Sequence, residues 1–326
     1  MNEYYGTPSE LYLREQDEKK RIKYIGKIAG LCIIGYVIIQ NILSIILFSG
    51  RLGDIYETDP DFQSVATILF SVAGIFVPFA IGGRSIRKRT GADIWNLGKP
   101  VDTKLMLAAV PLGFFVCLAG NYVTGVFVDL MEEIGIHLTA PEYVVPSGFA
   151  GKLVYIVSIA VIPPLVEEFA IRGVVMQPLR KYGDKFAILA SALVFAVLHG
   201  NLIQAPFALV AGIGIGYAVC ITNSVWTGVL IHVANNLYSV IIEFMIEGIP
   251  DEALLDKVYL ATSGVLYAVS LIGSVIFVIL RKNRRVMPSF TALRESKKMF
   301  AFMWSVPMII ALIIMYQITK NFVELG

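Results

Sequence analysis

Long apolar segments alternate with short polar ones along almost the whole sequence. Each apolar segment is long enough to cross about 30 Å of bilayer hydrocarbon as a helix, although 186–203 is marginal. No strand-like alternation typical of a barrel is visible, and helices satisfy their own backbone groups in lipid. The pattern predicts an all-α, polytopic transmembrane helix bundle of about nine spans, at 24–49, 62–82, 105–130, 149–178, 186–203, 205–222, 225–246, 258–280 and 299–319.

Composition supports a membrane protein. The 326 residues are 56% hydrophobic and only 16% charged, with a mean hydropathy of +0.72, whereas a soluble chain carries about 25% charged residues. The first apolar segment is too long for a signal peptide and is interpreted as an uncleaved anchor. We therefore expect a multi-pass protein of the cell membrane, with the lipid bilayer as its surroundings and no nucleic-acid partner. The three cysteines, Cys32, Cys117 and Cys220, lie far apart in apolar segments without metal-ligand spacing.

The basic residues indicate an orientation. With the N-terminus inside and every span crossing once, the inside segments hold 22 of the 27 Lys and Arg residues. The outside loops are acidic instead, with Glu142 among their carboxylates. Because positively charged loops stay in the cytoplasm, the N-terminus is predicted to be cytoplasmic and the C-terminus outside. The inside basic residues lie in Arg14 to Lys27, Arg84 to Lys104, Arg180 to Lys185 and Arg281 to Lys298.

One region of this topology is less defined. The loops within 200–225 carry no charge, so the two spans predicted there can also be one broken element. Gly212, Gly214 and Gly216 form a small-residue stripe, which is typical of close helix packing. Approach of the backbone to a substrate is the alternative.

Two adjacent carboxylates, Glu167 and Glu168, lie late in the apolar segment 149–178. A charged side chain at the bilayer centre costs roughly 2.5–3.5 kcal/mol on insertion scales, so such residues usually pair and mark a working site. Arg172 follows Glu168 by four residues and shares its helix face. Glu167 is rotated by about 100° and lacks that partner. We therefore predict a paired, structural Glu168 beside a reactive Glu167.

Two of the three histidines also lie within predicted spans. Glu167 is 13 residues before Arg180, and His199 is 14 residues after Lys185 on the next, antiparallel helix. At 1.5 Å per residue, both lie roughly 20 Å from the same loop. His232 lies somewhat shallower on a third helix, with Asn235 and Asn236 on its face. The depths place these side chains in one polar pocket that opens towards the cytoplasm, whereas His137 lies in an outside loop and is considered incidental.

Several chemistries fit such a pocket. A buried glutamate and a histidine can polarise water, while a second histidine and an Asn amide can stabilise an oxyanion, as in a hydrolase. The same residue types can bind zinc and activate its water. A proton relay or a Glu/His proton-coupled carrier uses them too, although a carrier often shows inverted repeats and no repeat is visible. A buried structural ion pair is the remaining interpretation.

Three motifs resemble one family. Glu-Glu-x-x-x-Arg at 167–172, Phe-x-x-x-His at 195–199 and His-x-x-Asn-Asn at 232–236 are similar to the CAAX protease and bacteriocin-processing family, also called Abi, which includes the Ras-converting CAAX endopeptidase. The resemblance covers about 145–245. It divides the chain into a cytoplasmic N-terminal segment, N-terminal transmembrane helices, a catalytic core and C-terminal transmembrane helices, at 1–23, 24–144, 145–247 and 248–326.

The resemblance implies an intramembrane endopeptidase that cuts a peptide or membrane-protein substrate from a cavity open to the cytoplasm. By position, Glu167 and His199 activate water, and His232 and Asn236 form the oxyanion hole. Glu168, Arg172 and Asn235 support them. We favour a glutamate-type mechanism without a cofactor; the alternative is a zinc metalloprotease with Glu167, His199 and His232 as ligands.

The substrate is left open by the resemblance. Prenylated CAAX substrates are not implied, since peptide pheromones, bacteriocin leaders and membrane-embedded regulators are also substrates expected in this family. A non-catalytic membrane scaffold or bacteriocin-immunity protein of the same fold is the alternative function.

Overall fold

The computed structural model describes residues 7–94, 100, 102–141, 143–282 and 284–325. Residues 1–6 of the predicted N-terminal segment, Lys99 of an inside loop and Glu142 of an outside loop lie outside the described residues. The first half contains α1 (Pro8–Leu47), α2 (Gly50–Thr58), α3 (Pro60–Leu69), η1 (Phe70–Phe76), α4 (Val77–Thr90), α5 (Thr103–Glu133) and β1 (Ile136–Leu138). The middle of the chain contains α6 (Phe149–Ile156), η2 (Val157–Val161), α7 (Ile162–Glu168), η3 (Phe169–Met176), α8 (Gln177–Arg180), α9 (Asp184–Leu198), α10 (Gln204–Thr222) and α11 (Val225–Gly248). The chain continues with α12 (Glu252–Arg281), α13 (Glu295–Met303), α14 (Val306–Lys320) and β2 (Val323–Leu325).

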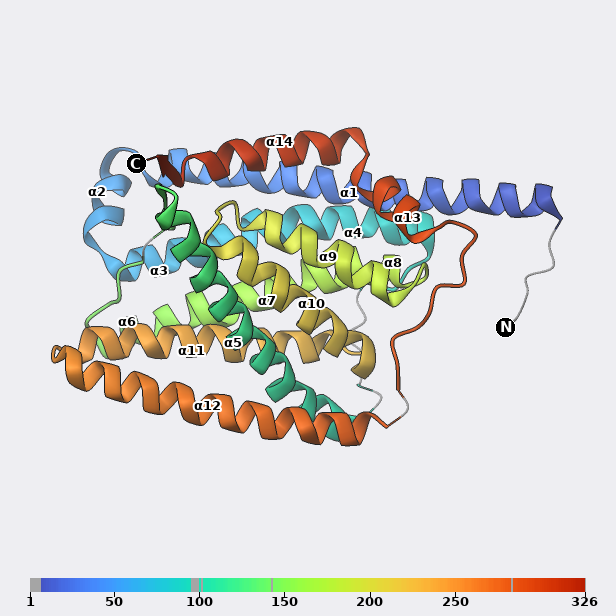
Figure 1. The fold of residues 1–326 in the computed structure, drawn as a ribbon. Helices are drawn as coiled ribbons and strands as arrows, with labels where there is room; N and C mark the ends of the chain where they lie inside the picture. Colours follow the sequence, from blue (N-terminus) through green and yellow to red (C-terminus); the bar gives the residue numbers. More distant parts are fainter. Residues whose placement is uncertain (1–6, 95–99, 101, 142, 283, 326) are drawn as a thin grey trace.

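The helices form one bundle with most axes running along a common direction (Figure 1). Helices α7, α9 and α10 lie in its middle, α1 and α14 pack side by side on one flank, and α11 and α12 lie on the other. The long helix α5 crosses the bundle obliquely and packs on α10, α11 and α12. Helix α1 begins at one end of the bundle, and α14 ends at the other. The predicted all-α polytopic bundle is confirmed, while the assignment of either end to the cytoplasm stays a prediction.

The number of spans differs from the predicted nine. In the described part of the chain, seven helices are long and apolar enough to cross a membrane, or eight when α13 and α14 count together. These two helices are bent by 72° at the break after Met303, where Ser305 caps the next helix and Pro307 occupies its first turn. The predicted span 299–319 is therefore a broken element.

The predicted span 186–203 is the other difference. Helix α9 has only 15 residues and ends at Leu198, because Gly200 adopts a left-handed φ of +65° that favours glycine and commonly ends helices. The side chain of Asn201 then accepts a hydrogen bond from Gln204 N at 2.9 Å and starts α10. Residues 200–225 are therefore a turn and a separate helix, and α10 is long enough to span.

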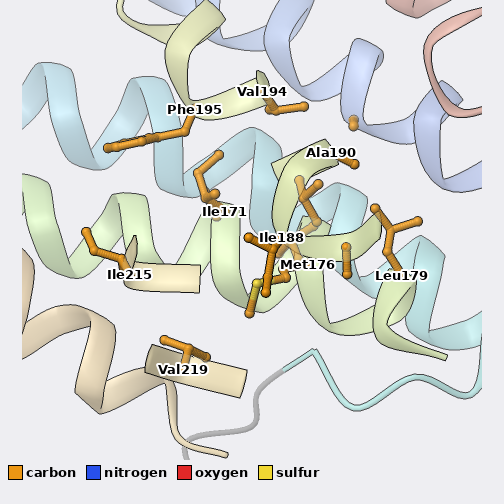
Figure 2. Close-up of a cluster of buried hydrophobic side chains, with 14 of the residues drawn as sticks. Ile171, Met176, Leu179, Ile188, Ala190, Val194, Phe195, Ile215 and Val219 are labelled. Carbon is orange, nitrogen blue, oxygen red and sulfur yellow. The ribbon is translucent and has the colours of Figure 1, made fainter. Parts of the chain in front are cut away.

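The core lies where η3, α8, α9 and α10 meet. Figure 2 shows Ile188 and Met176 close together in this cluster, with Ile171 nearby. Gly212 and Gly216 approach α9 there, while Gly214 faces Val116 of α5; added Cβ atoms would meet Ala192, Ile188 and Val116, respectively. The glycine stripe is thus a packing surface, as predicted. Cys32, Cys117 and Cys220 are buried and unbridged.

Among the residues that the structure describes, three π-helical turns interrupt the bundle, and two of them, η2 and η3, flank α7. Such turns frequently occur at functional sites. The cause at the start of α7 is visible in the sequence, because Pro163 and Pro164 have no N–H group to donate along the helix. The helix containing the adjacent carboxylates is therefore irregular on both sides of them.

Contacts between distant segments close each end of the bundle. At one end, β1 pairs antiparallel with β2, and Thr139 N donates to Phe322 O at 3.1 Å. At the other end, residues 284–294, here called the strap, cross from α12 to α13. Buried Glu18 accepts from Leu293 N at 2.9 Å, and Met287 N donates to Asp184 at 2.8 Å. Charged side chains thus hold the strap against α1 and α9.

Candidate active site

Glu168 and Arg172 form a fully buried ion pair. Arg172 Nη1 lies 3.0 Å from Glu168 Oε1, and both side chains are 0% exposed. The contact is an ion pair without hydrogen-bond alignment. The guanidinium also donates to Gly212 O at 3.4 Å and lies 4.9 Å from the ring centre of Phe195. The pairing predicted from their four-residue spacing is confirmed.

His232 joins this pair from α11. Its Nδ1 atom lies 3.1 Å from Glu168 Oε1, while its Nε2 atom lies 3.8 Å from Glu167 Oε2. Gly228, one turn earlier on α11, permits this approach, because a Cβ atom there would lie 2.5 Å from Glu168 Oε2. The imidazole therefore lies between two carboxylates. We refer to Glu167, Glu168, Arg172 and His232 as the carboxylate cluster.

Glu167 differs from its neighbour in exposure and in partners. Its side chain is 18% exposed, against 0% for Glu168. Within the described part of the chain, its carboxylate makes no hydrogen bond, and its contact with His232 is a 3.8 Å one. Tyr36 and Tyr143 lie within electrostatic range of it. Glu167 is therefore the more accessible and less restrained of the two carboxylates.

His199 follows the last residue of α9 and is held by its own backbone. Its Nδ1 atom lies 2.8 Å from Phe195 O. Since a carbonyl oxygen only accepts, Nδ1 carries the proton and Nε2 of the neutral ring presents a lone pair. The ring of Phe195 packs against His199 and His232, at centroid distances of 4.7 and 5.6 Å. Phe195 thus separates the two imidazoles.

The turn after α9 fixes the backbone of His199. Asn201 is 2% exposed and donates to His199 O at 3.1 Å and to Gln204 Oε1 at 3.0 Å. The first bond satisfies the carbonyl just after α9, while Asn201 Oδ1 accepts from Gln204 N at the start of α10. His199 is therefore displayed from a buried, hydrogen-bonded turn, and it lies within electrostatic range of Glu167.

Asn236 bonds to the irregular backbone before α7. Its Nδ2 atom donates to Ile159 O at 3.0 Å. That carbonyl cannot receive an α-helical bond from residue 163 or a π-helical bond from residue 164, because both are prolines. The side chain of Asn236 therefore replaces a missing backbone donor. An amide nitrogen carries two protons, so one N–H of Asn236 is left for another acceptor.

Several buried hydrogen-bonding atoms around this site have no partner. Asn235 donates to Asn236 Oδ1 at 3.3 Å, while its own Oδ1 is buried without a hydrogen-bond partner. Glu168 Oε2 and Arg172 Nε are also buried and unpartnered. Buried polar groups in folded proteins are nearly always satisfied. Unused donors and acceptors therefore concentrate where the sequence motifs meet.

The zinc alternative can be tested against the donor atoms. Metal-ligating histidines bind through one ring nitrogen and usually donate the other to a carboxylate or a backbone carbonyl, and His232 and His199 each have one nitrogen facing such an oxygen. In the part of the chain that the structure describes, however, no three His, Cys, Asp or Glu side chains are arranged to hold a metal ion. The side chains of Glu167, His199 and His232 are therefore not grouped around one ion position in this arrangement.

The structure brings together the side chains that the motifs singled out, and it adds three contacts that the sequence reasoning missed. These are the bond of His232 to Glu168, the close approach of Gly228 and the bond of Asn236 to Ile159. The tandem prolines were a signal for the last contact, since they announce an unpaired carbonyl four residues earlier. His137 lies in β1, where it is paired with Glu324 of β2, and it is not part of the carboxylate cluster.

Fold and site together define a multi-pass helical membrane protein with a buried Glu–Arg–His cluster. Residues 149–238, less than a third of the chain, match the model of a family described as type II CAAX prenyl endopeptidase Rce1-like. All seven candidate side chains lie in that segment, and the match confirms the resemblance drawn from the motifs. The match implies peptidase activity. No curated protein and no solved structure matches the chain.

Proposed function

We propose that the protein is an intramembrane endopeptidase of the glutamate type, in which Glu167 is the general base. The observation that carries this proposal is the contrast within one pair of residues. Glu168 is fully buried and contacts Arg172 and His232 through Oε1, whereas Glu167 is partly exposed and makes no hydrogen bond within the described chain. A base needs a free carboxylate near its substrate, and a neighbouring structural pair keeps that carboxylate in place.

In the proposed reaction, a water molecule lies between Glu167 and His199. Glu167 accepts a proton from this water while the oxygen attacks the scissile carbonyl carbon. The Nε2 lone pair of His199 accepts the second water hydrogen as a hydrogen bond and so orients the nucleophile. When the tetrahedral intermediate collapses, the C–N bond breaks and protonated Glu167 gives its proton to the leaving amine.

The oxyanion is assigned to His232 and Asn236. Asn236 retains one N–H after its bond to Ile159 O, and donors of this kind stabilise the charge that develops on the carbonyl oxygen. In this assignment, Nε2 of His232 donates to the oxyanion, while Nδ1 faces Glu168, which orients the ring. This gives Glu168 and Arg172 a supporting role and Asn235 the role of orienting the neighbouring amide.

The metal-free mechanism is supported by the unsuitable donor geometry for zinc and is tested directly. Purified protein should keep its activity after treatment with 1,10-phenanthroline and exhaustive dialysis against EDTA. Loss of activity with recovery on added Zn²⁺ would replace the glutamate mechanism with a metalloprotease.

The function itself is tested by comparing protein N-termini in membranes from cells that express the wild type or Glu167→Gln. N-termini present only with the wild type and the control would establish proteolysis and identify substrates, prenylated or not. Glu243→Gln is a matched control, because Glu243 lies on α11, is bound by Tyr155 at 2.7 Å and lies outside the carboxylate cluster. Identical profiles at equal protein levels would favour the non-catalytic scaffold or immunity protein instead.

A further inference from the structure

A second polar site lies at the end of the bundle where α1 begins. A cavity of about 420 Å³ opens between α1, the segment after α4 and the turn after α8. Its size falls within the roughly 300–1,000 Å³ of small-molecule sites. It is lined by Arg21, Thr90, Gly91, Ala92, Asp93, Gln177, Pro178, Lys181 and Tyr182.

The cavity lies at the depth where membrane-spanning helices end. The span Pro60–Thr90 ends at its rim, and the span Phe149–Arg180 ends beside Lys181. Arg21 lies three residues before the apolar part of α1, which the sequence places at 24–49. Three helices therefore pass from hydrocarbon into the polar layer around this cavity, which is the level of lipid headgroups.

Hydrogen-bond donors line the cavity in excess. Tyr182 is only 4% exposed, and its hydroxyl makes no hydrogen bond to any residue that the structure describes. Burial raises the pKa of Tyr182 to about 12, so the phenol stays a neutral donor. The Nε2 atom of Gln177 is buried without a hydrogen-bond partner. Gln177 Nε2 thus lacks the acceptor that buried polar groups normally have, and the Tyr182 hydroxyl adds a second available donor.

Two cations complete the lining. Arg21 uses Nε to bind Asp17 at 2.7 Å, which leaves the outer nitrogens of its guanidinium for a ligand. Lys181 is exposed and forms no ion pair within the described residues. The one lining carboxylate, Asp93, has an interaction of its own in the protein. The charges and donors of the lining thus fit a ligand that is anionic and rich in acceptor oxygens.

We propose that this cavity binds the phosphate of an anionic lipid headgroup. Arginine and lysine are the usual partners of phosphate, and basic pockets between membrane helices bind anionic headgroups. Bound there, the phosphate joins α1, the end of α4 and the end of the helix that carries Glu167. The proposal concerns binding only and does not depend on the proposed peptidase activity.

Native mass spectrometry of the full-length protein in neutral detergent tests the proposal. Phosphatidylglycerol, phosphatidylcholine and inorganic phosphate are the three probes, titrated separately. We expect one phosphatidylglycerol to bind at least tenfold more tightly than phosphatidylcholine. The double variant Arg21→Gln/Lys181→Gln should weaken that binding at least fivefold. Ala92→Trp, which fills the cavity and keeps its charge, should weaken it similarly.

The matched control is Lys20→Gln/Lys185→Gln, which removes two exposed charges from the same end of the bundle but none from the cavity. It should bind phosphatidylglycerol like the wild type. Equal weakening in both double variants would reveal diffuse surface attraction and overturn the proposal, as would equal binding of the two lipids. If inorganic phosphate binds as tightly as phosphatidylglycerol, the ligand is soluble phosphate and the lipid assignment is wrong. Melting temperatures of all variants show whether each one is folded.

Discussion

Two clusters of buried charge lie in this bundle, and they differ in how completely their atoms are paired. At the strap, Glu18 accepts hydrogen bonds from Arg14 and from two backbone amides. Fully buried Lys298 donates to Tyr182 O at 2.7 Å, to Glu295 at 2.6 Å and to Ser289. The carboxylate cluster, by contrast, leaves atoms of Glu168 and Arg172 unpartnered.

This difference in hydrogen-bond pairing indicates that the two clusters have different roles. A buried charge that only holds a fold is stable when every donor and acceptor is used. The carboxylate cluster tolerates unused capacity and places a nearly unrestrained Glu167 beside it. Unsatisfied buried groups cost free energy, so we expect bound water or another molecule to supply the missing partners at this point.

The largest effect is expected for Glu167→Gln. The substitution keeps size and hydrogen bonding but removes the proposed base, so cleavage should fall by roughly 10²–10⁴-fold while the melting temperature hardly changes. His199→Ala should lose cleavage as well. Both are measured with purified protein and a substrate identified from the N-terminal profiles. Wild-type cleavage by Glu167→Gln would contradict the mechanism.

The next largest effect is expected for Arg172→Met. It leaves Glu168 as a buried charge without its main counter-charge, which costs about 3–5 kcal/mol of stability. Adding Glu168→Gln removes the stranded charge, so the double variant should be more stable than Arg172→Met alone. Unfolding by denaturing detergent measures both. If the stability losses of Arg172→Met and Glu168→Gln, measured singly, simply add in the double variant, the two side chains do not stabilise the protein as a pair.

Lys298→Met should destabilise the protein by about 1–3 kcal/mol, because the carbonyl of Tyr182 and its neighbours lose a buried donor. Cleavage per folded molecule should stay at the wild-type level, since Lys298 bonds to Tyr182, Ser289 and Glu295 and to no residue of the carboxylate cluster. Lys297→Met is the matched control: its partner Glu15 is on the surface, and exposed pairs contribute little. A specific loss of cleavage in Lys298→Met would contradict the distinction between the clusters.

The smallest effect concerns Asn236 and the prolines. Asn236→Ala leaves Ile159 O unpaired and should cost about 1 kcal/mol, in addition to its effect on cleavage. Pro163→Ala supplies an N–H four residues after that carbonyl. In a double-mutant cycle, the stability cost of Asn236→Ala should therefore shrink in the Pro163→Ala background, while cleavage is not restored. Strict additivity of the two stability changes would show that the Asn236 side chain does not replace the missing proline donor.

The helical architecture could be read from hydropathy because lipid leaves few alternatives to a spanning helix. What hydropathy could not locate were the interruptions. Gly200 ends α9 through its backbone conformation, and the turn before Val306 bends the last predicted span by 72°. Apolar side chains continue through both interruptions, so a composition window overlooks them.

At the candidate site, the periodicity of the sequence predicted side-chain contacts within one helix but not contacts between helices. The four-residue spacing of Glu168 and Arg172 was enough to predict their pairing. The contact of His232 with Glu168 depends on how α11 packs on α7, which is governed by Gly228 and by the bond of Asn236 to Ile159. No local pattern encodes such a contact, and the roles of these residues in catalysis stay predictions.

The packing of α1 on α13 and α14 has a consequence for biogenesis. Gly26 and Gly30 lie directly against the backbone around Phe302 and Met308, so α1 is covered by helices that are synthesised much later. β1 likewise meets its partner strand only when residues 323–325 have been made. During synthesis, the small-residue face of α1 is therefore open to lipid or to insertion factors until α13 and α14 have been made.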